Sequence, residues 1–357
     1  MARLLLAGYI GCGNLGDDAM MLGFAHGLPD YEINVLAGSP EEIHRNYGFN
    51  ATPRKDNKAV EAAIKQCDAL VFPGGSIFQD VTSVFSVKYY NDLVSDAKKA
   101  GKKVLILGQG VGPLTNMFGK RMAASAFNAA DAISVRDPQS LQTLKDLGVK
   151  KHARVTADCA FLLPQPPQNE DEEAYNVGGM KSIGLAPRPL DKKTDVSGLF
   201  GELCRLMYQS GTMPVLVEMD REEDGPLIEE IHKKQGGRIP QIRKLQTPMQ
   251  FQQRIRRVEA VVAMRLHAGI LAATVGVPSL MVSYDPKVAA FAKLIGIASP
   301  LPLEGLTATR LFDAFTAFMK DKDRNAKILE RKSEEMRKLA EVNIEIVREQ
   351  VRSSAAA

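Results

Sequence analysis

The chain begins with Arg3-Leu4-Leu5-Leu6-Ala7-Gly8-Tyr9-Ile10-Gly11-Cys12-Gly13-Asn14-Leu15-Gly16, an apolar run that leads directly into closely spaced glycines. An apolar run of this length is typical of a strand buried on both faces of a parallel sheet. No small-residue cleavage site follows it, which argues against a signal peptide. A buried strand, a glycine turn and then a helix predict the first unit of an α/β fold.

The same alternation of short apolar runs and amphipathic stretches continues along the chain. Strands are predicted at residues 3–10, 33–36, 69–72, 104–108, 132–135 and 154–156, and again at 182–186, 214–218, 260–264 and 279–283. Helices are predicted at residues 58–66, 88–100, 140–147, 196–209, 226–234, 248–257, 267–275, 287–294 and 324–352. This pattern predicts repeated βαβ units around parallel sheets.

A break in composition separates two such series. From Pro164 the chain is first proline-rich and then acidic, with almost no side chain that could pack in a core. We therefore predict a linker over residues 164–181, between domains at residues 1–163 and 182–320. For residues 321–357 we predict a terminal helix that could pack back on the first domain. The predicted architecture is α/β, with two Rossmann-like domains facing each other across a cleft.

Composition excludes several classes of protein. Of 357 residues, 45% are hydrophobic and 25% charged, which is typical of a globular chain. The net charge of +4 argues against a dedicated nucleic-acid binder. No apolar run is long enough for a transmembrane helix. Four dispersed cysteines and five histidines indicate neither a disulfide framework nor a metal site. We expect a soluble cytoplasmic protein.

The first glycine motif, residues 11–16, matches the G-x-G-x-x-G dinucleotide fingerprint. An NAD site also needs an acidic residue at the end of the second strand, where residues 36–39 (Leu-Ala-Gly-Ser) offer none. Asp17 and Asp18 at the helix start would repel a pyrophosphate. We therefore favour a substrate-facing loop with Asn14 and Asp17 as polar contacts, and a purely structural turn is the alternative.

Two further glycine-rich motifs follow strands of the same half. In residues 73–80, the paired glycines allow close approach of a ligand at Gly75, and Gln79 and Asp80 could bind sugar hydroxyls. A strand-to-helix turn with a helix cap explains the same residues. Residues 108–113 end the next strand similarly. Together the three motifs predict one rim of a binding cleft.

Cationic residues follow other predicted strands. Arg136 could bind a phosphate or carboxylate bidentately, or it could pair with Asp137 or Asp158. Arg265 and His267 stand where a strand runs into a helix, a position that favours anions. An arginine would bind the charge of a phosphorylated substrate there while the histidine exchanges a proton.

Two more cations lie at predicted strand ends of the second half. Lys287 follows the strand at residues 279–283, after Asp285 as a helix cap and Pro286 in the first helical turn. Arg188 follows the strand at residues 182–186. Each could also be an ordinary surface residue, but the shared sheet edge makes them candidates for the same site.

These motifs in combination resemble the polysaccharide pyruvyl transferases, particularly the bacterial branch that acts on cell-wall polymers. The resemblance spans about residues 4 to 295 and is carried by residues 8–9, 13–18, 74–83, 109–113, 134–137, 156–158, 264–267 and 283–287. The chain departs from the family pattern at Ile10, where a second aromatic residue is usual, and at Asp18, where glutamate is usual.

The resemblance implies a two-domain fold like that of B-type glycosyltransferases, with phosphoenolpyruvate as co-substrate and no cofactor or metal. It implies transfer of the enolpyruvyl unit to two hydroxyls of one sugar, giving a cyclic ketal and phosphate. The implied acceptor is β-N-acetylmannosamine on a lipid-linked saccharide, with the ketal across O4 and O6. A lipid-linked acceptor would bring the enzyme into peripheral contact with the inner face of the cell membrane.

By matching motifs, the resemblance implies donor binding by Arg136, Arg265 and Leu266, to which we add Arg188. His267 is the implied acid catalyst, and Lys287 a further cation that could deliver the proton. The main alternative is a nucleotide-sugar glycosyltransferase, in which Glu218 is the candidate for binding ribose. An NAD-dependent oxidoreductase and a non-catalytic carbohydrate-binding module are weaker alternatives. The sequence does not define an oligomeric state.

Overall fold

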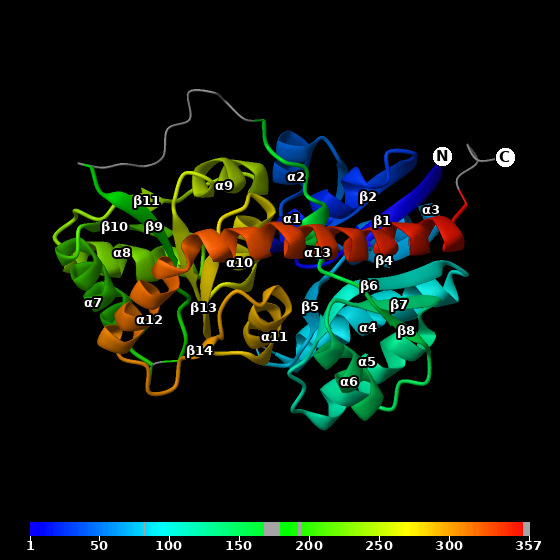
Figure 1. Cartoon of the computed structure of the whole chain (residues 1–357). Helices are drawn as coiled ribbons and strands as arrows, with labels where there is room; N and C mark the ends of the chain where they lie inside the picture. Colours follow the sequence, from blue (N-terminus) through cyan, green and yellow to red (C-terminus); the bar gives the residue numbers. More distant parts are fainter. Residues whose placement is uncertain (82, 168–178, 192–193, 353–357) are drawn as a thin grey trace. The chain divides into compact units, whose positions relative to one another are not determined.

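Figure 1 shows the chain as a computed structural model, which describes residues 1–81, 83–167, 179–191 and 194–352. The chain divides into two compact units, each built on a parallel sheet. The first unit comprises Met1–Leu163 and the residues from Met336 onward, and the second is Pro164–Glu335. Residues 168–178 of the predicted linker lie outside the described residues.

The sheet of the first unit has the order β3-β2-β1-β4-β6-β7-β8, and β5 pairs with β6 beside this path. The strands are β1 (Ala2–Ala7), β2 (Tyr31–Ala37), β3 (Asn50–Pro53), β4 (Ala69–Phe72), β5 (Gly75–Phe78), β6 (Lys103–Val111), β7 (Ala132–Val135) and β8 (Ala153–Val155). Their pairings are parallel, and β4 is buried along its whole length. The predicted α/β fold is confirmed.

The sheet of the second unit has the order β11-β10-β9-β12-β13-β14, with parallel pairings. Its strands are β9 (Lys181–Ala186), β10 (Thr212–Val217), β11 (Gln241–Ile242), β12 (Ala260–Ala263), β13 (Ser279–Ser283) and β14 (Leu301–Pro302). In both units the strand order reverses beside the first strand, as in doubly wound Rossmann-like sheets.

Helices cover the sheets on both sides, as Figure 1 shows. The first unit contains α1 (Leu15–His26), α2 (Pro40–Tyr47), α3 (Asn57–Gln66), α4 (Val84–Lys99), α5 (Met117–Ala129), α6 (Pro138–Asp146) and the 3₁₀ helix η1 (Cys159–Leu162). The second contains α7 (Val196–Gln209), α8 (Asp224–Lys234), α9 (Pro248–Ile255), α10 (Leu266–Thr274), α11 (Pro286–Ile295) and α12 (Ala308–Lys320). Each unit has its own apolar core between sheet and helices.

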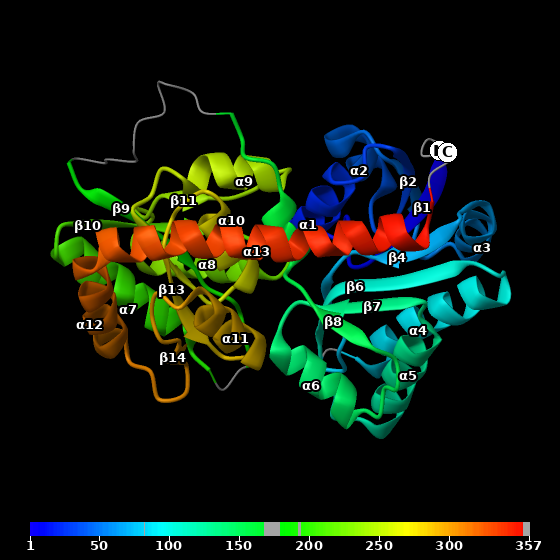
Figure 2. The ribbon, with the colours of Figure 1, turned by 45° about the vertical axis from the view of Figure 1, so that its right-hand side comes forward.

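The last helix, α13 (Lys322–Gln350), belongs to both units. It is the long orange-to-red helix of Figures 1 and 2. In the first unit its fully buried Asn343 accepts hydrogen bonds from the hydroxyls of Ser134 (2.6 Å) and Thr156 (3.0 Å). The Asn343 amide donates to the carbonyl of Ala157 at 3.2 Å. This buried polar contact fixes the end of α13 to β7 and to the residues after β8.

Candidate functional site

Ligands of doubly wound sheets bind at the carboxyl ends of the strands where the strand order reverses. In the first unit this point lies between β1 and β4, and in the second between β9 and β12. Asn14 and Gly75 follow β1 and β4, while Arg188 and Arg265 follow β9 and β12. Predicted site residues therefore occupy the expected position in each sheet.

Arg265 is the central cation of the second unit. It is 7% exposed and stands at the N-cap of α10, so its backbone position is set by the junction between β12 and that helix. Its Nε lies 3.0 and 3.1 Å from the two carboxylate oxygens of Asp224, and its Nη2 donates to Glu223 at 2.8 Å. Asp224 is fully buried. The guanidinium is thus held by two consecutive carboxylates at the start of α8.

Arg188 joins the same cluster from the end of β9. Its guanidinium lies over the ring of Tyr284, 5.3 Å from the ring centroid, and donates to the Tyr284 hydroxyl. Its Nη2 lies 3.5 Å from the carboxylate of Glu223. Its Nε is buried and has no hydrogen-bond partner among the described residues. A buried donor without an acceptor is costly, so this N–H is available to a ligand.

Lys287 and His267 begin the two neighbouring helices. Asp285 caps α11 by accepting the backbone N–H of Lys287 at 2.9 Å, and its carboxylate lies 3.6 Å from the lysine Nζ. His267 is half-buried in the first turn of α10, after the buried Leu266. The helix start after each strand therefore presents a titratable side chain at the carboxyl edge of the sheet.

Glu223 lies among the positive charges of Arg265, Arg188 and Lys287. Burial acts to raise its pKa, but the surrounding positive charges outweigh burial and hold that pKa below its ordinary value. The Glu223 side chain remains 46% exposed. A mobile anionic ligand could take its place between the cations. We define Arg188, Glu223, Arg265, Tyr284 and Lys287 as the cation cluster.

The candidate acceptor residues near the first glycine motif lie in a loop that is held by hydrogen bonds within the protein. The Asn14 side chain caps α1 by accepting the N–H of Gly16 at 2.9 Å, as a structural turn would require. The buried Asp18 accepts the N–H of Gly11 at 2.8 Å and the hydroxyl of Tyr47 at 3.1 Å. Burial raises the pKa of Asp18 to about 7. Asp17 remains half-buried beside this closed glycine loop.

The second glycine motif differs from the predicted loop, because Gly75 begins strand β5. Gly74 and Gly75 have φ values of 123° and 101°, which favour glycine where the chain leaves β4 for β5. Gln79 accepts the N–H of Val81 at 2.8 Å. The Asp80 carboxylate accepts backbone N–H groups of the α5 start, and these hydrogen bonds lower its pKa despite partial burial.

Arg136 has carboxylate partners of its own in the first unit. It is 6% exposed, and its Nη1 donates to Asp158 at 3.0 Å. Its Nε lies 3.7 Å from Asp137, and its Nη2 donates to Ser76 at 2.8 Å. The guanidinium lies against Gly110, where a Cβ would be 2.5 Å from Nη2. Pairing with Asp137 and Asp158, one of the two sequence interpretations, is therefore present.

One group that sequence reasoning missed is the aromatic cluster around Arg54. The guanidinium lies 5.0 to 5.8 Å from the ring centroids of Tyr9, Tyr89 and Tyr90. It donates to the Cys12 sulfur at 3.3 Å and to the Tyr90 hydroxyl at 3.2 Å. Among the described residues no carboxylate pairs with it. Arg54 follows β3, a strand that the sequence pattern did not predict.

The candidate ribose ligand of the alternative function already has partners. Glu218 is 4% exposed, and one of its oxygens accepts from Arg243 Nε at 2.9 Å. The other accepts the N–H of Lys244, also at 2.9 Å. Both carboxylate oxygens thus hold the residues after β11, which weakens the case for a ribose contact at Glu218.

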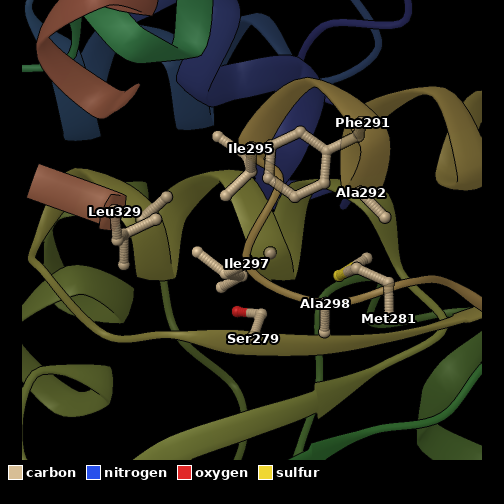
Figure 3. Close-up of a pocket in the computed structure, with 10 residues that line it drawn as sticks. Ser279, Met281, Phe291, Ala292, Ile295, Ile297, Ala298 and Leu329 are labelled. Atoms are coloured by element: carbon tan, nitrogen blue, oxygen red, sulfur yellow. The ribbon is translucent and has the colours of Figure 1, made fainter. Parts of the chain in front are cut away.

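Figure 3 shows an apolar pocket of the second unit between α10, α11 and β13. Met281, Phe291 and Ile295 line it together with Leu329, and its cavity of about 10 Å³ is about the size that one water molecule needs. None of the candidate residues lines this pocket. It is a small gap in core packing and not the site.

Among the described residues, no group of three or more His, Cys, Asp or Glu side chains could hold a metal ion. Within the same residues, no helix has both the length and the apolar character that crossing a bilayer requires.

The family model of the polysaccharide pyruvyl transferases matches residues 14–286, so the chain belongs to this family. Among characterised sequences, it is similar to the amylovoran biosynthesis protein AmsJ of Erwinia amylovora. The two are 21% identical over 364 residues, covering 83% of this chain and 86% of AmsJ.

Solved structures similar to this chain have the same two-unit fold. MnaA of S. aureus, solved with UDP, superposes with a TM-score of 0.66 at 12% identity, over 99% of this chain and 98% of MnaA. HepE of Anabaena, also solved with UDP, superposes with a TM-score of 0.62 at 11% identity. The match covers 99% of this chain and 100% of HepE. At these identities the likeness establishes the fold, and the predicted B-type glycosyltransferase architecture is confirmed.

Proposed function

We propose that this polysaccharide pyruvyl transferase uses phosphoenolpyruvate to form a cyclic ketal on a sugar of a lipid-linked saccharide. The observation that carries the proposal is the cation cluster at the carboxyl ends of β9, β12 and β13. Phosphoenolpyruvate carries a phosphate and a carboxylate on three carbons, and it needs several fixed cations. The unpartnered Nε of Arg188 supports binding of an anion at this cluster.

The proposed chemistry balances without a cofactor. The methylene carbon of the donor accepts a proton, and a sugar hydroxyl adds to the neighbouring carbon. The bond from that carbon to the phosphate oxygen breaks, and the second hydroxyl attacks to close the ketal. Of the two hydroxyl protons, one balances the proton taken by the methylene carbon and the other leaves with the phosphate. His267 supplies the first proton in this scheme, and Arg188 and Arg265 stabilise the leaving phosphate.

We assign the acceptor to the first unit, near Asn14, Asp17 and the Arg54 cluster. Exposed tyrosine rings suit the apolar faces of sugars, and Tyr9 is 42% exposed. Arg54 would bind an anionic group of a lipid-linked saccharide, such as its phosphate. The proposed acceptor sugar is β-N-acetylmannosamine, with the ketal across O4 and O6.

Phosphate release tests this function directly. The enzyme should release phosphate from phosphoenolpyruvate only when a suitable acceptor glycoside is present, and the product should gain a ketal carbon by NMR. Calorimetry with phosphoenolpyruvate, a UDP-sugar and NAD in parallel should detect binding of phosphoenolpyruvate only. Binding of the UDP-sugar without phosphoenolpyruvate binding would favour the glycosyltransferase alternative.

Replacing Glu223 with glutamine should tighten phosphoenolpyruvate binding roughly tenfold, because it removes a negative charge that competes for Arg188 and Arg265. Calorimetry measures the change in Kd. The matched control is Glu222→Gln, since the neighbouring Glu222 contacts neither arginine through its side chain in the described structure. Weaker binding in Glu223→Gln would mean that Glu223 positions the arginines and does not compete with the donor.

Replacing Arg54 with glutamine should raise the acceptor KM about 10- to 100-fold, the usual cost of losing a hydrogen bond to a charged group. The Kd of the donor should not change. Arg45→Gln is the control, because Arg45 is an exposed arginine that approaches only Glu42 and Asn46 within the described part of the chain. An unchanged acceptor KM in Arg54→Gln would restrict Arg54 to holding its three tyrosines.

A further inference from the structure

Four large apolar side chains are strongly exposed in one region of the first unit. Their exposed fractions are 68% for Val81, 74% for Phe85, 59% for Met117 and 69% for Phe118. Burying a phenylalanine side chain is favourable, so two exposed phenylalanines in one region indicate a surface that a partner covers. We define these four residues as the apolar patch.

Three members of the apolar patch come from the first turns of two helices that begin at the same sheet edge. Helices α4 and α5 pack against each other (Figures 1 and 2), and both follow parallel strands that end at the same sheet edge. Phe85 lies in the first turn of α4, and Met117 and Phe118 in the first turn of α5. Asp80, which precedes Val81, accepts hydrogen bonds from the residues at the start of α5.

Asp80 forms hydrogen bonds with the two residues that precede α5. Its carboxylate accepts the N–H of Thr115 at 2.9 Å and that of Asn116 at 2.7 Å. A Cβ added to Gly119 would lie 2.8 Å from it. Hydrogen bonds to Asp80 therefore hold the backbone just before Met117 and Phe118, two of the exposed side chains.

The charges that adjoin the apolar patch are chiefly positive. Lys120 and Arg121 directly follow it in α5, and within the described part of the chain neither forms an ion pair or a side-chain hydrogen bond. Lys88, one turn after Phe85, pairs with Asp92. The Asp80 charge is engaged by backbone N–H groups. Exposed phenylalanines with adjacent unpaired cations are the composition of surfaces that bind anionic bilayers.

We propose that the apolar patch, with Lys120 and Arg121, docks this protein on the surface of an anionic phospholipid bilayer. The side chains of Phe85 and Phe118 insert among the lipid headgroups, and the two cations bind lipid phosphates. A second copy of the chain could bury the same apolar side chains, but two adjacent unpaired cations would then face their own like charges across a symmetric contact. The charge pattern therefore favours the bilayer.

Vesicle flotation of the full chain tests the proposal. The protein should float with vesicles of phosphatidylcholine and phosphatidylglycerol in equal parts, and much less with phosphatidylcholine alone. Phe85→Ser with Phe118→Ser should lower the vesicle partition coefficient at least about tenfold. Lys120→Gln with Arg121→Gln should lower it about fivefold per charge, only for the anionic vesicles. Tyr208→Ser removes another exposed aromatic residue (55% exposed), on α7, and should leave binding unchanged.

The possible outcomes distinguish a bilayer from a second copy of the chain as the partner of the apolar patch. Failure of the wild-type chain to float, or equal flotation of all variants, would overturn the proposal. If light scattering showed a dimer that Phe85→Ser with Phe118→Ser converts to monomer, the partner would be a second copy instead. Flotation does not depend on pyruvyl transfer, so a failed phosphate-release assay would leave this result intact.

Discussion

Replacing Arg265 with alanine should lower the free energy of unfolding by about 3–5 kcal/mol, the largest stability effect we expect in this chain. The variant leaves the carboxylate of the fully buried Asp224 without its cation. Glu223 loses the same partner but is half exposed, so water can solvate it. Most of the cost therefore arises from Asp224. Urea denaturation followed by circular dichroism measures the change.

The pH dependence of this loss identifies its cause. Burial already acts to raise the pKa of Asp224, and the Arg265 charge opposes that rise. Without Arg265, folded Asp224 should hold its proton to a higher pH than it does in the unfolded chain. A raised folded-state pKa gives stability that is lost as pH increases, so the deficit should be larger at pH 8 than at pH 5.

A second substitution provides the control for Arg265→Ala. Asp224→Asn in the same chain removes the buried charge, so the double variant should recover much of the stability lost at pH 8. Arg205→Ala removes an exposed arginine that, among the described residues, contacts only Glu202 and Gln209, and should change the stability little. A deficit that is independent of pH would show that lost packing, and not the unpaired carboxylate, destabilises the variant.

The central strands of both sheets could be predicted because a strand buried on two faces has a nearly continuous run of apolar residues. The predicted strands at residues 69–72, 132–135 and 279–283 coincide with β4, β7 and β13. Each is short, and its apolar residues are nearly continuous. The strand at residues 3–10 was predicted to end three residues too late, because the chain turns at Gly8 to begin the glycine loop.

Short or peripheral strands could not be predicted from the same signal. β3 (Asn50–Pro53), β11 (Gln241–Ile242) and β14 (Leu301–Pro302) lie at sheet edges and carry few buried side chains. β5 was mistaken for a loop because its paired glycines favour turns. Missing β3 also concealed Arg54, whose place at the sheet edge depends on that strand.

The cations of the second unit could be anticipated because each follows a predicted strand. Their carboxylate partners could not. Glu223 and Asp224 come after β10, 41 residues before Arg265 in the case of Asp224. They reach Arg265 only because β9 lies between β10 and β12 in the sheet, an order that strand periodicity does not reveal. The sequence therefore suggested a site of cations alone, whereas the structure has cations balanced by acids.

Replacing His267 with glutamine should lower kcat by about 10²- to 10⁴-fold, the usual contribution of a positioned general acid. Glutamine keeps a side-chain N–H of similar reach but cannot transfer a proton at neutral pH. The donor Kd should change little, because Arg188 and Arg265 remain. Phosphate release at saturating phosphoenolpyruvate gives kcat, and calorimetry gives the Kd.

The pH profile and a matched control distinguish catalysis by His267 from a structural role. A general acid gives the kcat profile a basic limb, which His267→Gln should lose. His232→Gln removes the other histidine of this unit, whose Nδ1 contacts the carbonyl of Ile239, and should keep kcat and its profile. If His267→Gln kept a normal kcat and raised only the donor KM, His267 would be a binding residue. The proton would then come from Lys287, and Lys287→Gln should lower kcat instead.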